Sequence, residues 1–168
     1  MEHSASAGAG PAWALALEHS ALGETLRQAM WLYPIANVLH VLAVVAMVGS
    51  ILAFDLRLMG AAKSLPVAGL ARLLLPISAV GFVVAVVTGS LLFIADATAV
   101  WNNPVFVYKL ALIALGLVNI TVFHFGVWRS ASHWPASTPA PLPAKAGAAV
   151  SIAAWAATAT LGRLIAYF

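Results

Sequence analysis

Residues 30–60 read MWLYPIANVLHVLAVVAMVGSILAFDLRLMG, and this stretch decides the fold. Positions 28–54 contain no formally charged residue. A helix of about 20 apolar residues is long enough to cross the hydrocarbon core of a bilayer. We therefore predict a membrane-spanning helix here. It carries one imidazole, His40, and Asn37 lies three residues earlier on the same helical face.

The rest of the chain has the same character. Of its 168 residues, 63% are hydrophobic and 8% are charged, whereas a soluble domain has about a quarter of its residues charged. Three further intervals with few charges predict three more spans. We therefore predict an all-α integral membrane protein, a four-helix bundle formed by residues 30–168. The expected spans are about 31–54, 73–95, 105–128 and 147–167.

A different pattern precedes the first span. Residues 1–11 are mostly small, which predicts a mobile tail. In residues 12–29, apolar positions such as Trp13 and Leu17 alternate with charged ones such as Glu18. We predict that this segment is one amphipathic helix lying in the membrane interface.

The distribution of Lys and Arg residues is typical of topology signals in a membrane protein and not of a nucleic-acid-binding surface. The net charge is +3, but only eight Lys and Arg are present and they are spread between the spans. Five of them fall in the two loops on one side and three on the other, so the positive-inside rule places both termini outside. The chain has no cysteine, which excludes disulfides and thiolate metal sites. We expect the lipid bilayer as partner and no nucleic acid.

Small residues spaced four apart indicate where helices approach closely. The second span contains such a series, Gly81, Ala85 and Gly89. The fourth contains another, Ala149, Ala153 and Ala157. Between the last two spans, four prolines from Pro135 to Pro143 predict an extended, solvated loop without helix.

Depth along the helices predicts a polar cluster in the outer half of the membrane. At about 1.5 Å per residue, one imidazole, two cations and two hydroxyls reach a similar level. Unpaired cations in hydrocarbon are costly, so the cluster needs an anionic partner. The candidate cofactor-binding residues are His40, Lys109, Arg163, Asn37, Thr88 and Thr158.

A b-type haem would supply the anionic partner that such a cluster needs. Its iron takes an imidazole nitrogen, which we assign to His40, and its two propionates pair with Lys109 and Arg163. The expected role is electron transfer. Without a cofactor, His40 would instead hydrogen-bond to a neighbouring helix through Thr88 or Thr158.

The second intramembrane histidine belongs to another layer. His124 lies roughly 16 Å from the depth of His40, so the two cannot ligate one iron. We assign it to an inner polar layer with Asp55 and Arg57. There it serves either as a structural hydrogen-bond partner or as a second cofactor, metal or proton site.

Two other functions remain open on these residues. One is a cofactor-free structural or accessory subunit whose polar residues join helices and dock on a larger membrane complex. The other is an accessory protein of metal or ion transport. A redox or membrane-complex partner and a homo-oligomer are compatible with either, and no motif names a substrate.

Several segments resemble a family of small bacterial four-span membrane proteins defined as a domain of unknown function. The resemblance implies a multi-pass protein of the bacterial inner membrane and the four-helix fold, and it covers the chain from about Glu18 onward. It is carried by Trp31, Tyr33, Pro34, His40, Gly49 and Ser50, and by the segments FDLRLMG, TGSLLF, NPVFVYKLALIALGLVN and GRLIAY.

More distantly, the layout is similar to the membrane-type bacterial protoporphyrinogen oxidase and the copper-resistance CopD proteins. These share an early histidine in the first span, a TG element in the second, and an early lysine and late histidine in the third. The resemblance implies that His40 matches the haem-associated histidine and Lys109 the lysine. The chain differs at the end of the first span, where it has FDLRLMG.

Overall fold

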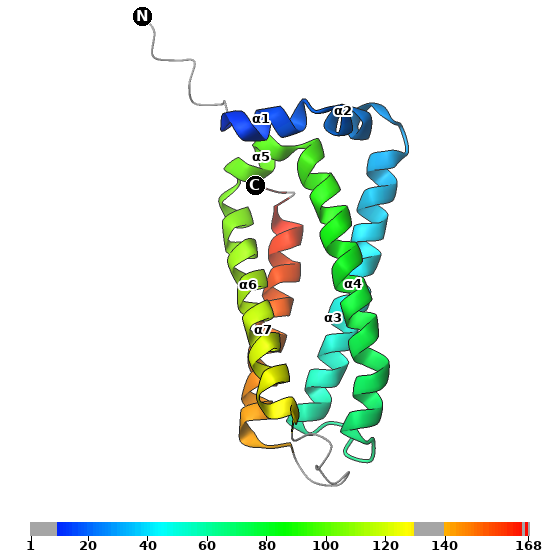
Figure 1. The fold of residues 1–168 in the computed structure, drawn as a ribbon, viewed down its shortest axis with the longest axis vertical. Coiled ribbons are helices and arrows are strands. Elements are labelled where there is room, and N and C mark those ends of the chain that lie inside the picture. The colour runs from blue at the N-terminus through cyan, green and yellow to red at the C-terminus, as the bar shows by residue number, and fades with distance from the viewer. Residues whose placement is uncertain (1–9, 130–139, 166, 168) are drawn as a thin grey trace, which may run out of the picture.

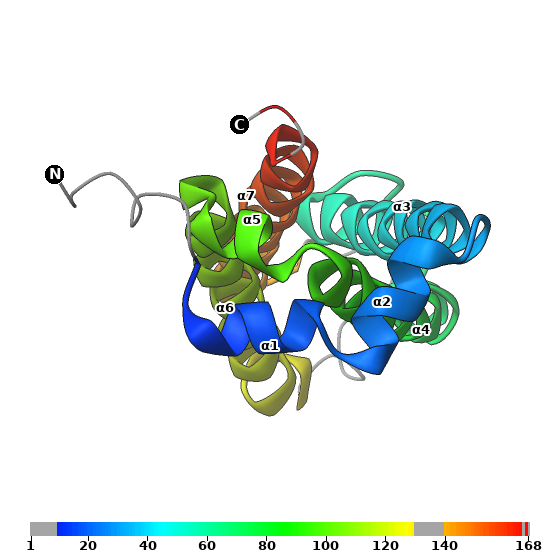
Figure 2. The same ribbon diagram turned by 90° about the horizontal axis from the view of Figure 1, so that it is seen from above.

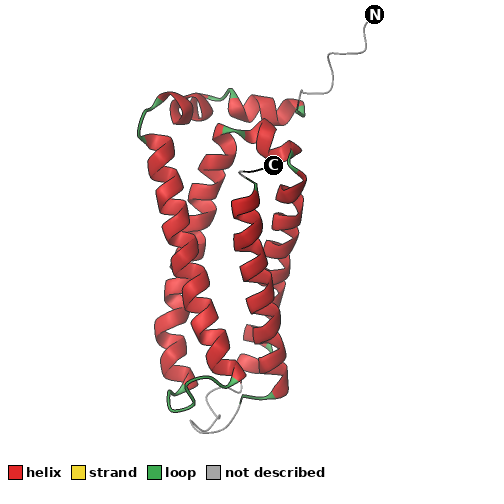
Figure 3. Cartoon of the chain, turned by 180° about the vertical axis from the view of Figure 1, so that it is seen from behind, coloured by secondary structure: helices red, strands yellow, loops and turns green. Residues whose placement is uncertain are grey.

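The computed structural model of the chain describes residues 10–129, 140–165 and 167, and this part is helical without a strand, as predicted. Figure 1 and, from behind, Figure 3 show long helices side by side with short ones across one end. The helices are α1 (Ala12–Glu18), α2 (Ala21–Gln28), α3 (Leu32–Met59), α4 (Val67–Ala95), α5 (Ala97–Asn102), α6 (Pro104–Phe125) and α7 (Leu142–Leu164).

Among the described residues, three helical segments are long and apolar enough to cross a membrane, Leu32–Met59, Val67–Ala95 and Pro104–Arg129. Large apolar side chains on their outer faces are exposed, for example Val80 and Val122, each 64% exposed. Such a surface suits lipid rather than water. Length and composition are those of a multi-pass membrane protein.

The long helices form an open ring (Figure 2). Helix α3 packs against α4 and α7, and α7 packs against α6. In the described part of the chain, the Cα atoms of α4 and α6 stay more than 8 Å apart, and the two helices meet through the stacked rings of Phe93 and Phe106, whose centroids lie 5.3 Å apart. The ring is therefore closed on three sides, and its fourth side is the gap between α4 and α6.

The predicted close approach of another helix to the small residues of α4 is confirmed, and the structure identifies that helix as α3. A Cβ atom added at Gly81 would lie 2.9 Å from the carbonyl oxygen of Ala43 and 3.0 Å from the backbone nitrogen of Met47. One added at Gly89 would lie 2.9 Å from Cε1 of His40. Since real Cβ atoms are not found so close to backbone, Gly81 has to be glycine for the two helices to touch there, whereas at Gly89 a Cβ would displace the imidazole ring of His40.

The prediction for the packed edge of α7 is wrong. Ala149 and Ala153 are exposed and Ala157 is only half-buried. Large side chains decide the orientation of the helix, because Trp155 is 2% exposed and its ring packs where Gly116 of α6 leaves space. The buried edge consists of Ala144, Ala148, Ser151, Ala154, Trp155 and Thr158.

The interfacial helix expected over residues 12–29 is two helices. Helix α1 ends at Glu18, and Ser20 begins α2 because its hydroxyl oxygen accepts a hydrogen bond from the backbone nitrogen of Gly23, 3.2 Å away. Serine is a preferred residue at this position. The break lets the two short helices lie at an angle across the end of the ring (Figure 2).

The proline-rich loop is shorter than expected. Helix α7 begins at Leu142, so Pro143 lies in its first turn, where a helix tolerates proline because that N–H has no helical acceptor. The expectation of no helix is therefore wrong at this residue. Residues 140 and 141 precede the helix, as expected for the loop. The other loop residues, 130–139, and most of the expected tail, 1–9, lie outside the described residues.

Contacts from α1 and α2 close one end of the ring. The Glu18 carboxylate accepts hydrogen bonds from the backbone N–H of Thr98, at 3.1 Å, and from its hydroxyl. These bonds lower the pKa of Glu18 below its ordinary value. Arg27 donates to the carbonyl oxygen of Ala95 at 3.1 Å. The same end holds a cluster of aromatic rings, Trp13, Phe93, Trp101 and Phe106.

Candidate functional site

His40 faces α4 from the N-terminal half of α3 and is half-buried. Its Nδ1 lies 2.9 Å from the carbonyl oxygen of Ala85 and 3.1 Å from the hydroxyl oxygen of Thr88. A carbonyl only accepts, so Nδ1 carries the hydrogen in this arrangement. In the neutral ring the lone pair is then on Nε2, which is the atom able to bind a metal.

Two positions on neighbouring helices frame this histidine. Gly89 leaves space for the ring on α4, as its added Cβ would meet Cε1. Lys109 of α6 is half-buried, its Nζ lies 3.2 Å from where a Cβ of Gly162 would be, and its charge acts on His40. The structure therefore brings His40, Thr88 and Lys109 to one level of the molecule.

The other residues predicted for this cluster lie differently. Arg163 is exposed, donates to the hydroxyl of Tyr167 at 3.0 Å and lies over its ring. Asn37 is exposed. Thr158 is buried, and its hydroxyl donates to the carbonyl oxygen of Ala154 at 2.8 Å. The predicted partnership of Arg163 with His40 therefore has no support from these contacts.

At the opposite end of α3, Asp55 and Arg57 are both buried but point in different directions. Arg57 donates from Nε to the carbonyl oxygen of Leu65, at 2.8 Å, and from a terminal nitrogen to that of Lys63, at 3.3 Å. It thereby holds the loop between α3 and α4. Asp55 points into the interior, since residues two apart lie on different faces of a helix.

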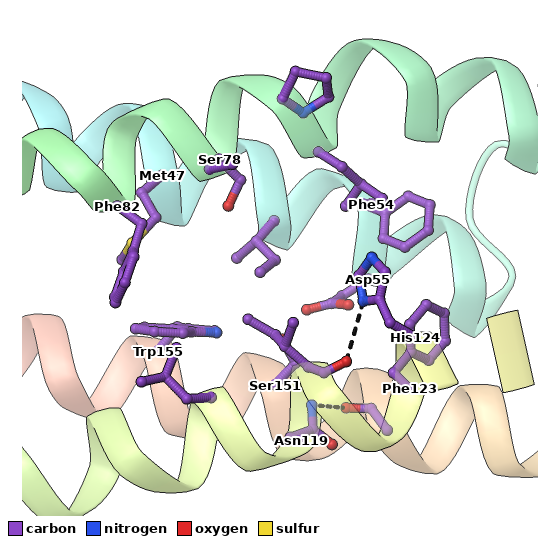
Figure 4. Close-up of a pocket in the computed structure, with 17 residues that line it drawn as sticks. Met47, Phe54, Asp55, Ser78, Phe82, Asn119, Phe123, His124, Ser151 and Trp155 are labelled. Carbon is purple, nitrogen blue, oxygen red and sulfur yellow. Dashed lines mark hydrogen bonds between the residues drawn. The ribbon is translucent and has the colours of Figure 1, made fainter. Parts of the chain in front are cut away.

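The interior at this level contains a cavity of about 480 Å³ between α3, α4, α6 and α7 (Figure 4). Its walls are mostly apolar. Two buried polar atoms at the cavity have no hydrogen-bond partner in the described structure, Oδ2 of Asp55 and Nε1 of Trp155. Its other polar lining residues are Ser78, Asn119, His124 and Ser151.

His124 contributes to this cavity from α6, in the inner layer to which we assigned it. Its side chain is exposed, and Nδ1 lies 3.1 Å from the carbonyl oxygen of Ile120 on the same helix. Among the described residues, no group of three His, Cys, Asp or Glu could hold a metal ion. The inner layer therefore offers a carboxyl group and a histidine, but no metal cage.

Sequence reasoning missed Trp155 and Ser151 as members of a site. Trp155 lies near the middle of the fourth predicted span and Ser151 one helical turn before it, whereas Trp31, Trp101 and Trp128 lie near span ends. A tryptophan at mid-span must bury its N–H away from the interface, and this is a signal that could have found it.

These observations define the class: in its described part, the chain is a helical protein with three helices of membrane-spanning length, a histidine tied between two helices, and an interior cavity with a buried carboxyl group. The chain matches no family model, no curated protein and no solved structure. The site alone therefore carries the functional argument.

Proposed function

We propose that the chain is a four-helix integral protein of the bacterial inner membrane, with α7 as the fourth span. At 23 residues α7 is about 35 Å long, enough to cross the hydrocarbon core. It packs between α3 and α6. The short helices α1 and α2 and the end of α7 are at the same end of the molecule, which suits both termini outside (Figure 1).

Within this bundle, we propose that His40 binds a b-type haem for electron transfer. The hydrogen bond from Nδ1 to the carbonyl oxygen of Ala85 carries the proposal. Histidines that ligate metals commonly donate their second N–H in this way, which fixes the ring and directs Nε2 to the metal. Lys109 supplies a positive charge at the same level for one propionate. A bound haem would supply one-electron chemistry.

The same contacts favour a second candidate, a cofactor-free accessory subunit. The bonds of His40 to Ala85 and Thr88 join α3 to α4, and polar ties of this kind stabilise helix pairs in membranes. If the chain has this function, His40 binds no metal or cofactor and serves to hold α3 and α4 together.

The visible spectrum of the detergent-purified protein, produced with ample haem, separates the two. For the haem protein we expect a Soret band that disappears in His40→Ala and persists in the matched control His124→Ala. Elution volume and helical circular dichroism verify that both variants fold. A well-folded wild-type protein that stays colourless after addition of haem contradicts haem binding, and this outcome does not depend on any variant.

A further inference from the structure

We propose that the inner cavity binds a lipid-soluble arylalkylamine, a molecule with an amino group on an alkyl chain attached to an aromatic ring. Its ammonium group pairs with Asp55, and it arrives from the bilayer between α4 and α6. This site is separate from His40 and does not depend on haem. The unpartnered Asp55 carboxyl oxygen, turned into an aromatic cavity, identifies the class of ligand.

The carboxyl group of Asp55 is buried. The residue is 4% exposed, and Oδ2 has no hydrogen-bond partner among the residues that the structure describes. The hydroxyl of Ser151 hydrogen-bonds to the same side chain. Arg57, the nearest cation along the chain, is directed to the carbonyl oxygens of the loop. A buried carboxylate with so few partners is costly, and a cation bound in the cavity would remove that cost.

The wall of the cavity is rich in aromatic rings. Phe54, Phe82, Phe123 and Trp155 line it, and aromatic faces attract organic cations. Figure 4 shows the carboxyl of Asp55 and the indole nitrogen of Trp155 directed into the same central space. The indole N–H can donate to an oxygen on the ligand. A volume of about 480 Å³ is within the range of small-molecule sites.

Access to the cavity is from the side of α4 and α6. Between these helices no Cα atoms of the described residues come within 8 Å of each other, and both helices line the cavity, through Ala79 and Phe82 on one side and Leu117 and Ile120 on the other. The aromatic cluster around Trp13 lies at one end of this gap. The route to the cavity therefore faces lipid, and it admits molecules that dissolve in the bilayer.

The test is calorimetric titration of the purified full chain with para-methoxyphenethylamine and with para-methoxyphenethyl alcohol, which has the same ring and ether but no ammonium group. We expect the wild-type protein to bind the amine about tenfold or more tightly than the alcohol. Asp55→Asn should reduce amine binding to the level of the alcohol. The matched control Asp96→Asn removes an exposed carboxyl group at the end of α4 and should leave binding unchanged.

Equal binding of the two probes by the wild-type protein, or no binding of the amine, overturns the proposal even if Asp55→Asn fails to fold. Amine binding that survives in a folded Asp55→Asn protein also overturns it. The Soret band of the same samples is read separately. If the protein binds the amine but shows no Soret band, the result contradicts haem binding by His40 and leaves the amine site supported.

Discussion

Gly81 faces the backbone of α3, whereas a Cβ added at Gly49 would meet no atom of another element within 4 Å. Both are glycines inside long apolar helices, so their intrinsic effects on helix formation are alike. The difference between them is the neighbouring helix. The close approach of α3 and α4 therefore requires that position 81 carries no side chain.

We predict that Gly81→Ala destabilises the protein by about 1–3 kcal/mol, because the new Cβ must push α3 away from α4. Gly49→Ala should be neutral or stabilising by up to about 1 kcal/mol, because it reduces the freedom of the unfolded chain without a clash. Thermal unfolding in the same detergent measures both. Equal midpoints for the two variants would refute the tight contact.

Arg57 and Asp55 show what residue spacing alone can and cannot predict. The sequence indicated a polar inner layer, and both residues are there. It did not indicate that Arg57 would bind loop carbonyls while Asp55 turned inward, because that depends on where the α3–α4 loop passes.

At the scale of elements, α1 and α5 are joined by one carboxylate. Glu18 accepts two hydrogen bonds from Thr98 and its pKa is lowered as a result. A group whose pKa is depressed on folding stabilises the folded state above its unfolded value, here 4.5, and loses that effect as the pH falls through the lowered pKa. The attachment of α1 should therefore weaken only in acid.

We predict that Glu18→Gln speeds hydrogen exchange at the amide of Thr98 at neutral pH, since a neutral amide oxygen is the weaker acceptor. The wild type and the variant should become alike once the pH is below the lowered pKa of Glu18. Exchange detected by mass spectrometry measures this. Glu24→Gln, which changes an exposed acid in the first turn of α2, is the matched control, and an equal effect of that variant would count against the contact.

At the scale of the whole molecule, the number of crossings determines which ends share a side. The structure has α2 and the end of α7 at one end and the α3–α4 loop at the other (Figure 1). If α7 crosses the membrane as we propose, residues near both termini face the same compartment. If it lies outside the bilayer, they do not.

The chain has no cysteine, so single cysteines report topology cleanly. We predict that a membrane-impermeant maleimide labels Gln28→Cys and Tyr167→Cys from outside intact cells. Lys63→Cys should react only after the cells are permeabilised. Labelling of Gln28→Cys and Tyr167→Cys from opposite sides would show that α7 is not a span, and labelling of Lys63→Cys alone from outside would reverse the orientation.

The sequence by itself determined the helical class, the membrane-length apolar segments and the small-residue face of α4, because apolar run length and residue spacing act along one helix. Only the tertiary structure decided which face of α7 is buried, that Arg163 turns to Tyr167 while Lys109 stays near His40, and that Asp55 and Trp155 share a cavity. The physical reason is that the backbone of a helix presents the same surface on every side. Its length and residue spacing therefore do not fix how the helix is rotated about its own axis. Its orientation is chosen by the large side chains and gaps of its neighbours, which lie far away in the sequence.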